Sequence, residues 1–553
     1  MMEKRILVIL IIFILFFLGI TGKAFYEQVI MGPTYASKSF EIRTQQFPAE
    51  EFKRGDILDR NGISLTNTTY QDALIIFPKL VKNPEQLVEN IANTLDIEIN
   101  LEDLEPYYRG TIKIYPEPIV IYLDENSEII TLIESWQEPG IVVAPIKKRY
   151  GENSLAVHLV GYLNYEQRGI KGLEARFDGY LQGSRAERIV TPITDARNNV
   201  LEGLGYRIIE LEPDPNRHDL FLTIDSRVQK IVEEAMDTRG ILKGGIVVLD
   251  INTGSILAAA SRPTFDQNNP TDTKGYEDNQ LERVIDYKVY PGSIFKVITA
   301  AAALEEGIVT PNTKFVCTGS SPYITCPREH GELTFSEAME RSCNTTLVEV
   351  GLKLGREKLE EYMIDRFGFT PEENKFLDSA KARANGIIGQ EIFKVSPLEM
   401  ANMMATIARD GYHQKIIDPW QTRLVKEVRG RQSTITFSEI PEFQKIYNQK
   451  TAQALKDILK ATNQKGSGQN AWVEGFGSAG KTGTPQILQS NGKYGYMAWY
   501  TGYAPLEEPK LAIAVLIEEM ANLNKKDLQG GRHAGPVFRE IAEKTLRLLD
   551  TGS

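Results

Sequence analysis

The longest apolar stretch of the chain lies at its N-terminus. Residues 6–22 read ILVILIIFILFFLGITG without a charge, and Lys4 and Arg5 come just before them. Such a run, extended to residue 26, is close to the length that crosses a bilayer, and the basic residues hold its short end inside. Because no small-x-small cleavage site precedes Glu27, we expect a cytoplasmic stub at residues 1–5 and an uncleaved transmembrane anchor at residues 6–26. The rest of the chain then lies outside the membrane.

Beyond the anchor, the spacing of apolar residues changes between strand-like and helix-like. Up to residue 215, the runs DALIIF and GIVVAPI predict strands and PEQLVENIANTLDI predicts an amphipathic helix. The prolines and acids of LEPDPNRHD, residues 211–219, then break the periodicity and place a domain boundary there. After it, LFLTI predicts a strand, GGIVVLD-INTG-SILAAAS a hairpin and SRVQKIVEEAMD a helix. The last third predicts a helix (TAQALKDILKAT), strands (YMAWYTGYA, LAIAVLIEE) and a closing helix (VFREIAEKTLRLL), so we expect a sheet flanked by helices.

Composition narrows the class of protein. Hydrophobic residues make up 42% and charged residues 25% of the 553 residues, which suits several folded domains and argues against global disorder. The formal charge of -11 argues against a nucleic-acid partner, because such proteins concentrate lysine and arginine to neutralise phosphates.

The three cysteines fit a protein that does not depend on disulfides. Cys317 and Cys326 flank the loop CTGSSPYITC, where they either pair or remain free thiols, and their spacing does not match a zinc knuckle. Cys343 is expected to be a small buried packing residue. The histidines are scattered, so we expect no metal site; they are His158, His218, His330, His413 and His533.

Candidate chemistry comes from a serine–lysine pattern. Ser-x-x-Lys occurs three times, at Ser293/Lys296, Ser478/Lys481 and Ser490/Lys493. Only Ser293 opens a predicted helix, SIFKVITAAAALEEG, and three residues along a helix return to one face, next to Lys296. Lysine can act as the base for a serine only if burial or a second cation lowers its pKa. An isolated pattern of this kind is usually a helix cap with a surface lysine.

Two further motifs change that interpretation. Ser342 and Asn344 form Ser-x-Asn in MERSCNTTLVEVG, and Lys481 begins the run Lys-Thr-Gly-Thr before an alternating strand. In this order, Ser-x-x-Lys, Ser-x-Asn and Lys-Thr-Gly make up the motif set of penicillin-binding proteins and class A β-lactamases. The chain resembles a class B penicillin-binding protein. RGDILDRNG, LAVHLVGY and GIKGLE resemble that family's non-catalytic pedestal, and LTID, PGSIFK, HGELTFSEAMERSCN, SPLEMAN, KTGTPQ and AWYTGYAP resemble its transpeptidase domain.

The resemblance implies an α+β, multi-domain fold. It implies an elongated pedestal or dimerisation-type domain at residues 27–215 and a transpeptidase domain of the serine β-lactamase type, with an antiparallel sheet, at residues 216–550. It also implies a monofunctional D,D-transpeptidase that cross-links peptidoglycan stem peptides and binds β-lactams, without a cofactor or metal. Its partners would be the cytoplasmic membrane and a SEDS-type glycan polymerase.

The resemblance also assigns roles to the motif residues. Ser293 would attack the penultimate D-Ala of a D-Ala-D-Ala stem peptide, with Lys296 as its base. Ser342 would pass the proton to the leaving amine. Asn344 would hold Lys296 and the substrate backbone, while Lys481 would lower the pKa of Lys296 as a second cation.

The remaining roles concern the substrate. Lys481, Thr482 and Thr484 would bind its terminal carboxylate, and Gly483 would let its backbone come close to the strand. The backbone N–H groups of Ser293 and Thr484 would form the oxyanion hole.

Alternative functions share residues with this site. A D,D-carboxypeptidase or a β-lactamase would use the same serine and lysine, although the Glu-x-x-Leu-Asn segment of class A lactamases is missing. The run GFGSAGKT, Gly475 to Thr482, also matches a phosphate-binding loop, which requires a helix immediately afterwards. Gly483 and Pro485 argue against that helix. The sequence leaves open whether the enzyme serves elongation, division or sporulation.

Overall fold

The computed structural model describes residues 2–26, 28, 47–50, 53–109, 112–123, 127–151, 154–164, 166–193, 206–271, 277–372, 377–431, 433–437, 442–488, 492 and 494–551. The chain forms two compact units. Unit 1 consists of Met1–Lys53, Thr69–Arg149 and Ser184–Asp214, and unit 2 of Arg54–Thr68, Tyr150–Gly183 and Pro215–Ser553.

The apolar run at the N-terminus forms helix α1 (Met2–Phe25). Across the described ranges, no helix reaches the combination of length and apolarity that a membrane span needs. The anchor at residues 6–26 stays a prediction.

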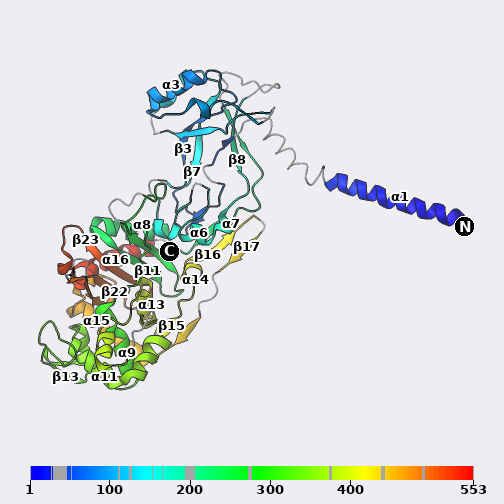
Figure 1. Cartoon of the computed structure of the whole chain (residues 1–553). Coiled ribbons are helices and arrows are strands. Elements are labelled where there is room, and N and C mark those ends of the chain that lie inside the picture. The colour runs from blue at the N-terminus through cyan, green and yellow to red at the C-terminus, as the bar shows by residue number, and fades with distance from the viewer. Residues whose placement is uncertain are drawn as a thin grey trace. The chain divides into compact units, whose positions relative to one another are not determined.

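Unit 1 contains two three-stranded antiparallel sheets, β6-β3-β7 and β1-β8-β9, and β3 (Thr69–Ile76) is the central strand of the first. β3 pairs with β6 (Ile119–Tyr122) and β7 (Ile141–Lys148), as the predicted strands DALIIF and GIVVAPI require (Figure 1). Its side chains alternate between two cores, because successive strand residues point to opposite faces. Leu74 and Ile76 pack with α3 (Pro84–Leu95) and α4 (Ser127–Ser135), and Ala73 and Ile75 pack toward the second sheet. The other elements are β1 (Phe47–Pro48), β8 (Arg188–Pro192), β9 (Tyr206–Glu210), η2 (Leu101–Asp103), β4 (Tyr107–Arg109) and β5 (Ile112–Ile114).

Unit 2 is built on a five-stranded antiparallel sheet, as expected for the catalytic domain. Its order is β12 (Ile256–Arg262), β11 (Ile241–Asp250), β23 (Leu511–Met520), β22 (Ala498–Ala504) and β19 (Ala479–Gly483). On one face, residues such as Val515 and Ile517 share a core with α8 (Ser226–Thr238) and the closing helix α16 (Gly535–Thr551). On the other face lies α13 (Pro397–Ala408), where Thr501 Oγ1 donates a hydrogen bond to Met400 O at 3.2 Å.

The helices that carry the catalytic motifs pack beside strand β19. α15 (Gln449–Lys465) contacts β19, α9 (Lys296–Glu305) and α10 (Phe335–Glu340), and α9 contacts α11 (Asn344–Glu360). The hairpin of β13 (Lys314–Cys317) and β14 (Gly331–Thr334) lies between α9 and α10 in the chain. The remaining elements are η3 (Gly292–Ile294), η4 (Glu361–Arg366), α12 (Ala380–Ile387), β15 (Tyr412–Gln414), α14 (Pro419–Thr422), β18 (Phe443–Lys445), η5 (Gln469–Ala471), β20 (Gln486–Leu488), β21 (Tyr494–Tyr496), η6 (Lys525–Asp527) and η7 (Gly530–Ala534).

A second sheet of unit 2 joins residues that are far apart in the chain. β2 (Ile57–Leu58) pairs in parallel with β10 (Asp219–Leu222), which pairs with β16 (Val425–Arg429) and through it with β17 (Thr434–Thr436). Helix α7 (Asp178–Leu181) contacts β10, α6 (Gly172–Arg176) contacts α7, and α5 (Val157–Val160) contacts α6. The buried Arg54 forms ion pairs with Glu174 at 2.6 Å and Asp178 at 2.7 Å. Residues 54–68 and 150–183, which fall within the range 27–215, therefore pack with the sheet of unit 2.

Candidate active site

Ser293 lies in a tight turn, η3, directly before helix α9. Gly292 has φ 59°, and a Cβ there would meet Pro485 N at 3.0 Å, so a side chain would disturb this turn. The Gly292 N–H donates to Gly389 O at 3.0 Å, which ties the turn to another segment. Among the described residues, the Ser293 hydroxyl has no hydrogen-bond partner, so it is available to a ligand.

Lys296 is the first residue of α9 and is fully buried. Its Nζ donates to Asn344 Oδ1 at 2.6 Å and to Ser342 O at 2.7 Å, and it lies 3.3 Å from Ser342 Oγ. Burial lowers the pKa of Lys296 to about 8, against the opposing effect of the Cys343 and Cys326 sulfurs. The first two motifs therefore meet at one amine that loses its proton easily.

Ser342 holds the second motif in an unusual backbone conformation. Its φ is 58°, in the left-handed region that costs a non-glycine residue on the order of 1–3 kcal/mol. This residue turns the chain between α10 and α11, with Cys343 as the N-cap residue of α11. Asn344 Nδ2 donates to Thr325 O at 2.8 Å, which leaves its Oδ1 for Lys296.

Lys481 lies in β19 opposite Thr501 and is fully buried, with its Nζ 3.3 Å from Thr482 O. Burial, and then the charge of Lys296, lowers the pKa of Lys481 well below its usual value. At Lys296, burial lowers the pKa, and the expectation from the resemblance that Lys481 lowers it further stays a prediction. Repulsion between two ammonium groups is mutual, so the charge of each lysine disfavours the charged form of the other.

The rest of the third motif lies against the serine turn. A Cβ on Gly483 would come within 2.4 Å of Pro291 O, so only glycine lets β19 approach the turn this closely. Thr482 Oγ1 lies 2.9 Å from Ser467 Oγ, and Thr484 Oγ1 accepts a hydrogen bond from the Gly530 N–H at 3.1 Å. Thr484 is exposed, whereas Thr482 is buried.

Other candidates from the sequence take structural positions. Ser478 is buried and donates to Ala471 O at 2.7 Å, and Ser490 and Lys493 lie outside the described residues. The run GFGSAGKT leads into strand β19 and not into a helix, so it lacks the N-terminal N–H groups of a phosphate-binding loop. All three cysteines are free thiols, so the alternative of a pair across the loop is not realised.

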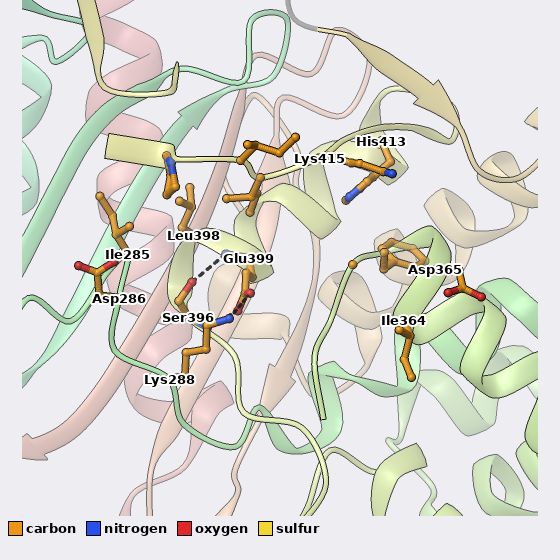
Figure 2. Close-up of a pocket in the computed structure, with 15 residues that line it drawn as sticks. Ile285, Asp286, Lys288, Ile364, Asp365, Ser396, Leu398, Glu399, His413 and Lys415 are labelled. Carbon is orange, nitrogen blue, oxygen red and sulfur yellow. Dashed lines mark hydrogen bonds and ion pairs between the residues drawn. The ribbon is translucent and has the colours of Figure 1, made fainter. Parts of the chain in front are cut away.

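A separate pocket in unit 2 has a volume of about 440 Å³. Figure 2 shows its lining, in which Lys288 and Glu399 form an ion pair at 2.5 Å and Ser396 caps helix α13. His413, from another side, is buried; burial and then the charges of Arg409, Arg423 and Lys415 lower the pKa of His413 to about 3. None of the motif residues lines this pocket.

Next to an antiparallel sheet, the buried Lys296 follows Ser293 by three residues and contacts the Ser-x-Asn motif. This arrangement defines a class of enzyme, the serine–lysine acyl transferases. Comparison with known families gives the particular group. Residues 244–543 match the penicillin binding protein transpeptidase domain, and residues 49–205 match the penicillin-binding protein dimerisation domain. The chain belongs to the class B penicillin-binding proteins.

Individual relatives are similar along nearly their whole lengths. The chain is 29% identical to stage V sporulation protein D of Bacillus subtilis, over 98% of this chain and 85% of the relative. It is 26% identical to peptidoglycan D,D-transpeptidase FtsI of Escherichia coli K12, over 96% and 89%. The crystal structure of penicillin binding protein 3 from Mycobacterium tuberculosis shares the fold, with a TM-score of 0.61, 22% identity and coverage of 91% and 97%. That protein has also been solved in complex with aztreonam and with ampicillin.

Proposed function

We propose that this chain is a monofunctional peptidoglycan D,D-transpeptidase that cross-links stem peptides through an acyl-enzyme on Ser293. The observation that carries the proposal is the buried Lys296 amine, with a pKa of about 8, held by Ser342 and Asn344 one turn after the serine. A base with a pKa near the working pH is the kind that general-base catalysis needs.

In the first half-reaction, Ser293 Oγ attacks the carbonyl carbon of the penultimate D-Ala, and neutral Lys296 takes the hydroxyl proton. The bond to the terminal D-Ala nitrogen then breaks, and Ser342 passes a proton from Lys296 to the leaving amine. In the second half-reaction, an amine of a neighbouring stem peptide attacks the ester and releases Ser293. Backbone N–H groups of Ser293 and Thr484 stabilise the oxyanion in both steps.

The third motif recognises the end of the donor peptide. A carboxylate beside Lys481 favours its ammonium form and so offsets the burial that lowers the Lys481 pKa. Thr482 and Thr484 supply hydroxyl groups to the same carboxylate, and Gly483 lets the peptide lie along β19.

The proposal extends to location and partners. Residues 6–26 anchor the chain with residues 1–5 in the cytoplasm, because Lys4 and Arg5 precede the apolar run. Residues 27–215 and 216–550 lie outside the membrane, where the stem peptides are. Unit 1 contacts a SEDS-type glycan polymerase in that membrane, which makes the strands that this enzyme cross-links.

The test is the fate of penicillin on the purified full-length protein. The opened drug stays attached and blocks the acceptor amine, so we expect one adduct per chain, on Ser293, that persists for many minutes. Ser293→Ala should form none, whereas Ser255→Ala, in the hairpin between β11 and β12, should behave as wild type. Rapid turnover of the drug would favour a β-lactamase. Release of D-Ala from a model peptide without transfer to an added amine would favour a D,D-carboxypeptidase.

A further inference from the structure

Four side chains that the proposed reaction does not use converge behind the Ser-x-Asn motif. Cys317, Cys326, His330 and Cys343 each offer one ligand atom, and these atoms lie within 4.8 Å of one another. Cys317 and Cys343 are fully buried. The register of the β13–β14 hairpin places Cys317 opposite Gly331, next to His330, and Cys343 arrives as the N-cap residue of α11.

The separations between these atoms fit a tetrahedral metal ion. Cys326 Sγ lies 3.7 Å from both Cys317 Sγ and Cys343 Sγ, and Cys317 Sγ lies 3.4 Å from His330 Nδ1. With Zn–S bonds of about 2.3 Å and a Zn–N bond of about 2.0 Å, tetrahedral angles require ligand separations of about 3.5 to 3.8 Å. Three cysteines and one histidine also form a known donor set of structural zinc sites.

Hydrogen-bond donors surround the sulfurs of Cys326 and Cys317. The backbone N–H groups of Asn344 and Thr345, at the N-terminus of α11, donate to Cys326 Sγ at 3.2 and 3.5 Å. Thr345 Oγ1 donates to Cys317 Sγ at 3.2 Å. Donors of this kind orient metal ligands and stabilise the negative charge that a metal-binding sulfur carries.

We propose that Cys317, Cys326, His330 and Cys343 bind one structural Zn²⁺ that holds the Ser-x-Asn motif against Lys296. This departs from the expectation from sequence that the chain has no metal site. The ion touches no substrate in this proposal, so the four ligands are positioning residues.

The link to the active site runs through the backbone. Cys343 lies between Ser342 and Asn344, the two residues that contact Lys296 Nζ, so its bond to the metal fixes both. Asn344 Nδ2 also donates to Thr325 O, and Thr325 precedes Cys326. The left-handed backbone of Ser342 is strained, and a metal bond at Cys343, the next residue, stabilises this backbone conformation. This positional role rests on the proposed function, whereas metal binding itself does not.

Metal content is the first measurement. Full-length protein, purified without chelators, should carry one zinc per chain by elemental analysis. Replacing the zinc with Co²⁺ should give the intense visible bands of tetrahedral thiolate coordination. Cys317→Ser should lower the zinc content, His330→Cys should retain it because a thiolate replaces the imidazole, and His218→Ala, a histidine outside the cluster, should match wild type.

Acylation by a fluorescent penicillin is the second measurement. Removing the zinc with a chelator should slow acylation of Ser293 by roughly 10- to 100-fold, the size of effect seen when groups that orient a site are lost, and added Zn²⁺ should restore it. Lys296→Arg should keep its zinc while losing acylation, which separates a failure of the proposed function from a failure of the metal site.

Three results would overturn the inference. Fully acylating protein with no bound zinc or with a Cys326–Cys343 disulfide would refute the metal site. A Cys317→Ser variant that loses zinc but acylates at the wild-type rate would refute the positioning role.

Discussion

Raising the pH from 7 to 9 should accelerate acylation of Ser293, because only neutral Lys296 can take the serine proton. With the pKa lowered by burial to about 8, the base is free in roughly a tenth of the molecules at pH 7 and in roughly nine tenths at pH 9. The expected gain is therefore about tenfold. At the ordinary value of 10.5, the neutral fraction at pH 7 would be lower by about 300-fold, or ~3.4 kcal/mol.

The assay is rapid-mixing acylation of the full-length protein by excess fluorescent penicillin between pH 6 and 10. The rate should rise with a midpoint near pH 8 and level off above it. Lys296→Arg should abolish acylation, because guanidinium stays protonated, while Lys230→Arg on the exposed face of α8 should reproduce the wild-type profile. A rate that is flat from pH 6 to 9, or near wild-type acylation by Lys296→Arg, would show that another group removes the proton.

Three further predictions concern a hydrogen bond in the active site, a buried ion pair and the orientation of the chain in the membrane. Asn344→Ala removes the 2.6 Å hydrogen bond to Lys296. The activation free energy of acylation should rise by about 1.5–3 kcal/mol, which slows acylation roughly 10- to 100-fold, and an unchanged rate would contradict the assigned role. Arg54→Ala strands the buried Glu174 carboxylate and should lower the free energy of unfolding in urea by about 3–5 kcal/mol. Arg547→Ala, at an exposed ion pair on α16, should cost less than about 1 kcal/mol, and equal losses would refute the argument. Protease added to wall-stripped cells should degrade the large C-terminal region. Protection of that region would count against its lying outside the membrane, and a mature N-terminus near residue 25 would count against an uncleaved anchor.

The strands and helices of the catalytic sheet could be predicted because their patterns are local. The hairpin of GGIVVLD and SILAAAS, the strands YMAWYTGYA and LAIAVLIEE, and the closing helix all form where the spacing of apolar residues indicates. The Ser-x-x-Lys pattern could be assigned to Ser293 because a helix follows it. The contact of Lys296 with Ser342 and Asn344 could be expected only from the motif set, because no local pattern in the sequence indicates it.

What could not be predicted depends on contacts between distant residues. β2 is only two residues long, so no periodicity marks it, and its parallel pairing with β10 is invisible in the sequence. The cluster of thiols forms because a hairpin register and a helix N-terminus meet, although the spacing of Cys317 and Cys326 alone resembles no metal motif. The left-handed backbone of Ser342 likewise has no signature, since serine seldom adopts it.

Unit 2 is assembled from three separate stretches of chain, which limits where the protein can be truncated without losing part of this unit. A fragment that starts at residue 216 encodes every catalytic motif, yet it lacks Asp59, which accepts hydrogen bonds from Ser226 at the start of α8. It also lacks β2, so β10 becomes an edge strand whose unpaired N–H and C=O groups can pair with a second copy of the fragment. Truncations there should aggregate. For the same reason, an exchange of only the residues after 215 between related proteins would place Ser226 and β10 against an Asp59 and a β2 from a different parent.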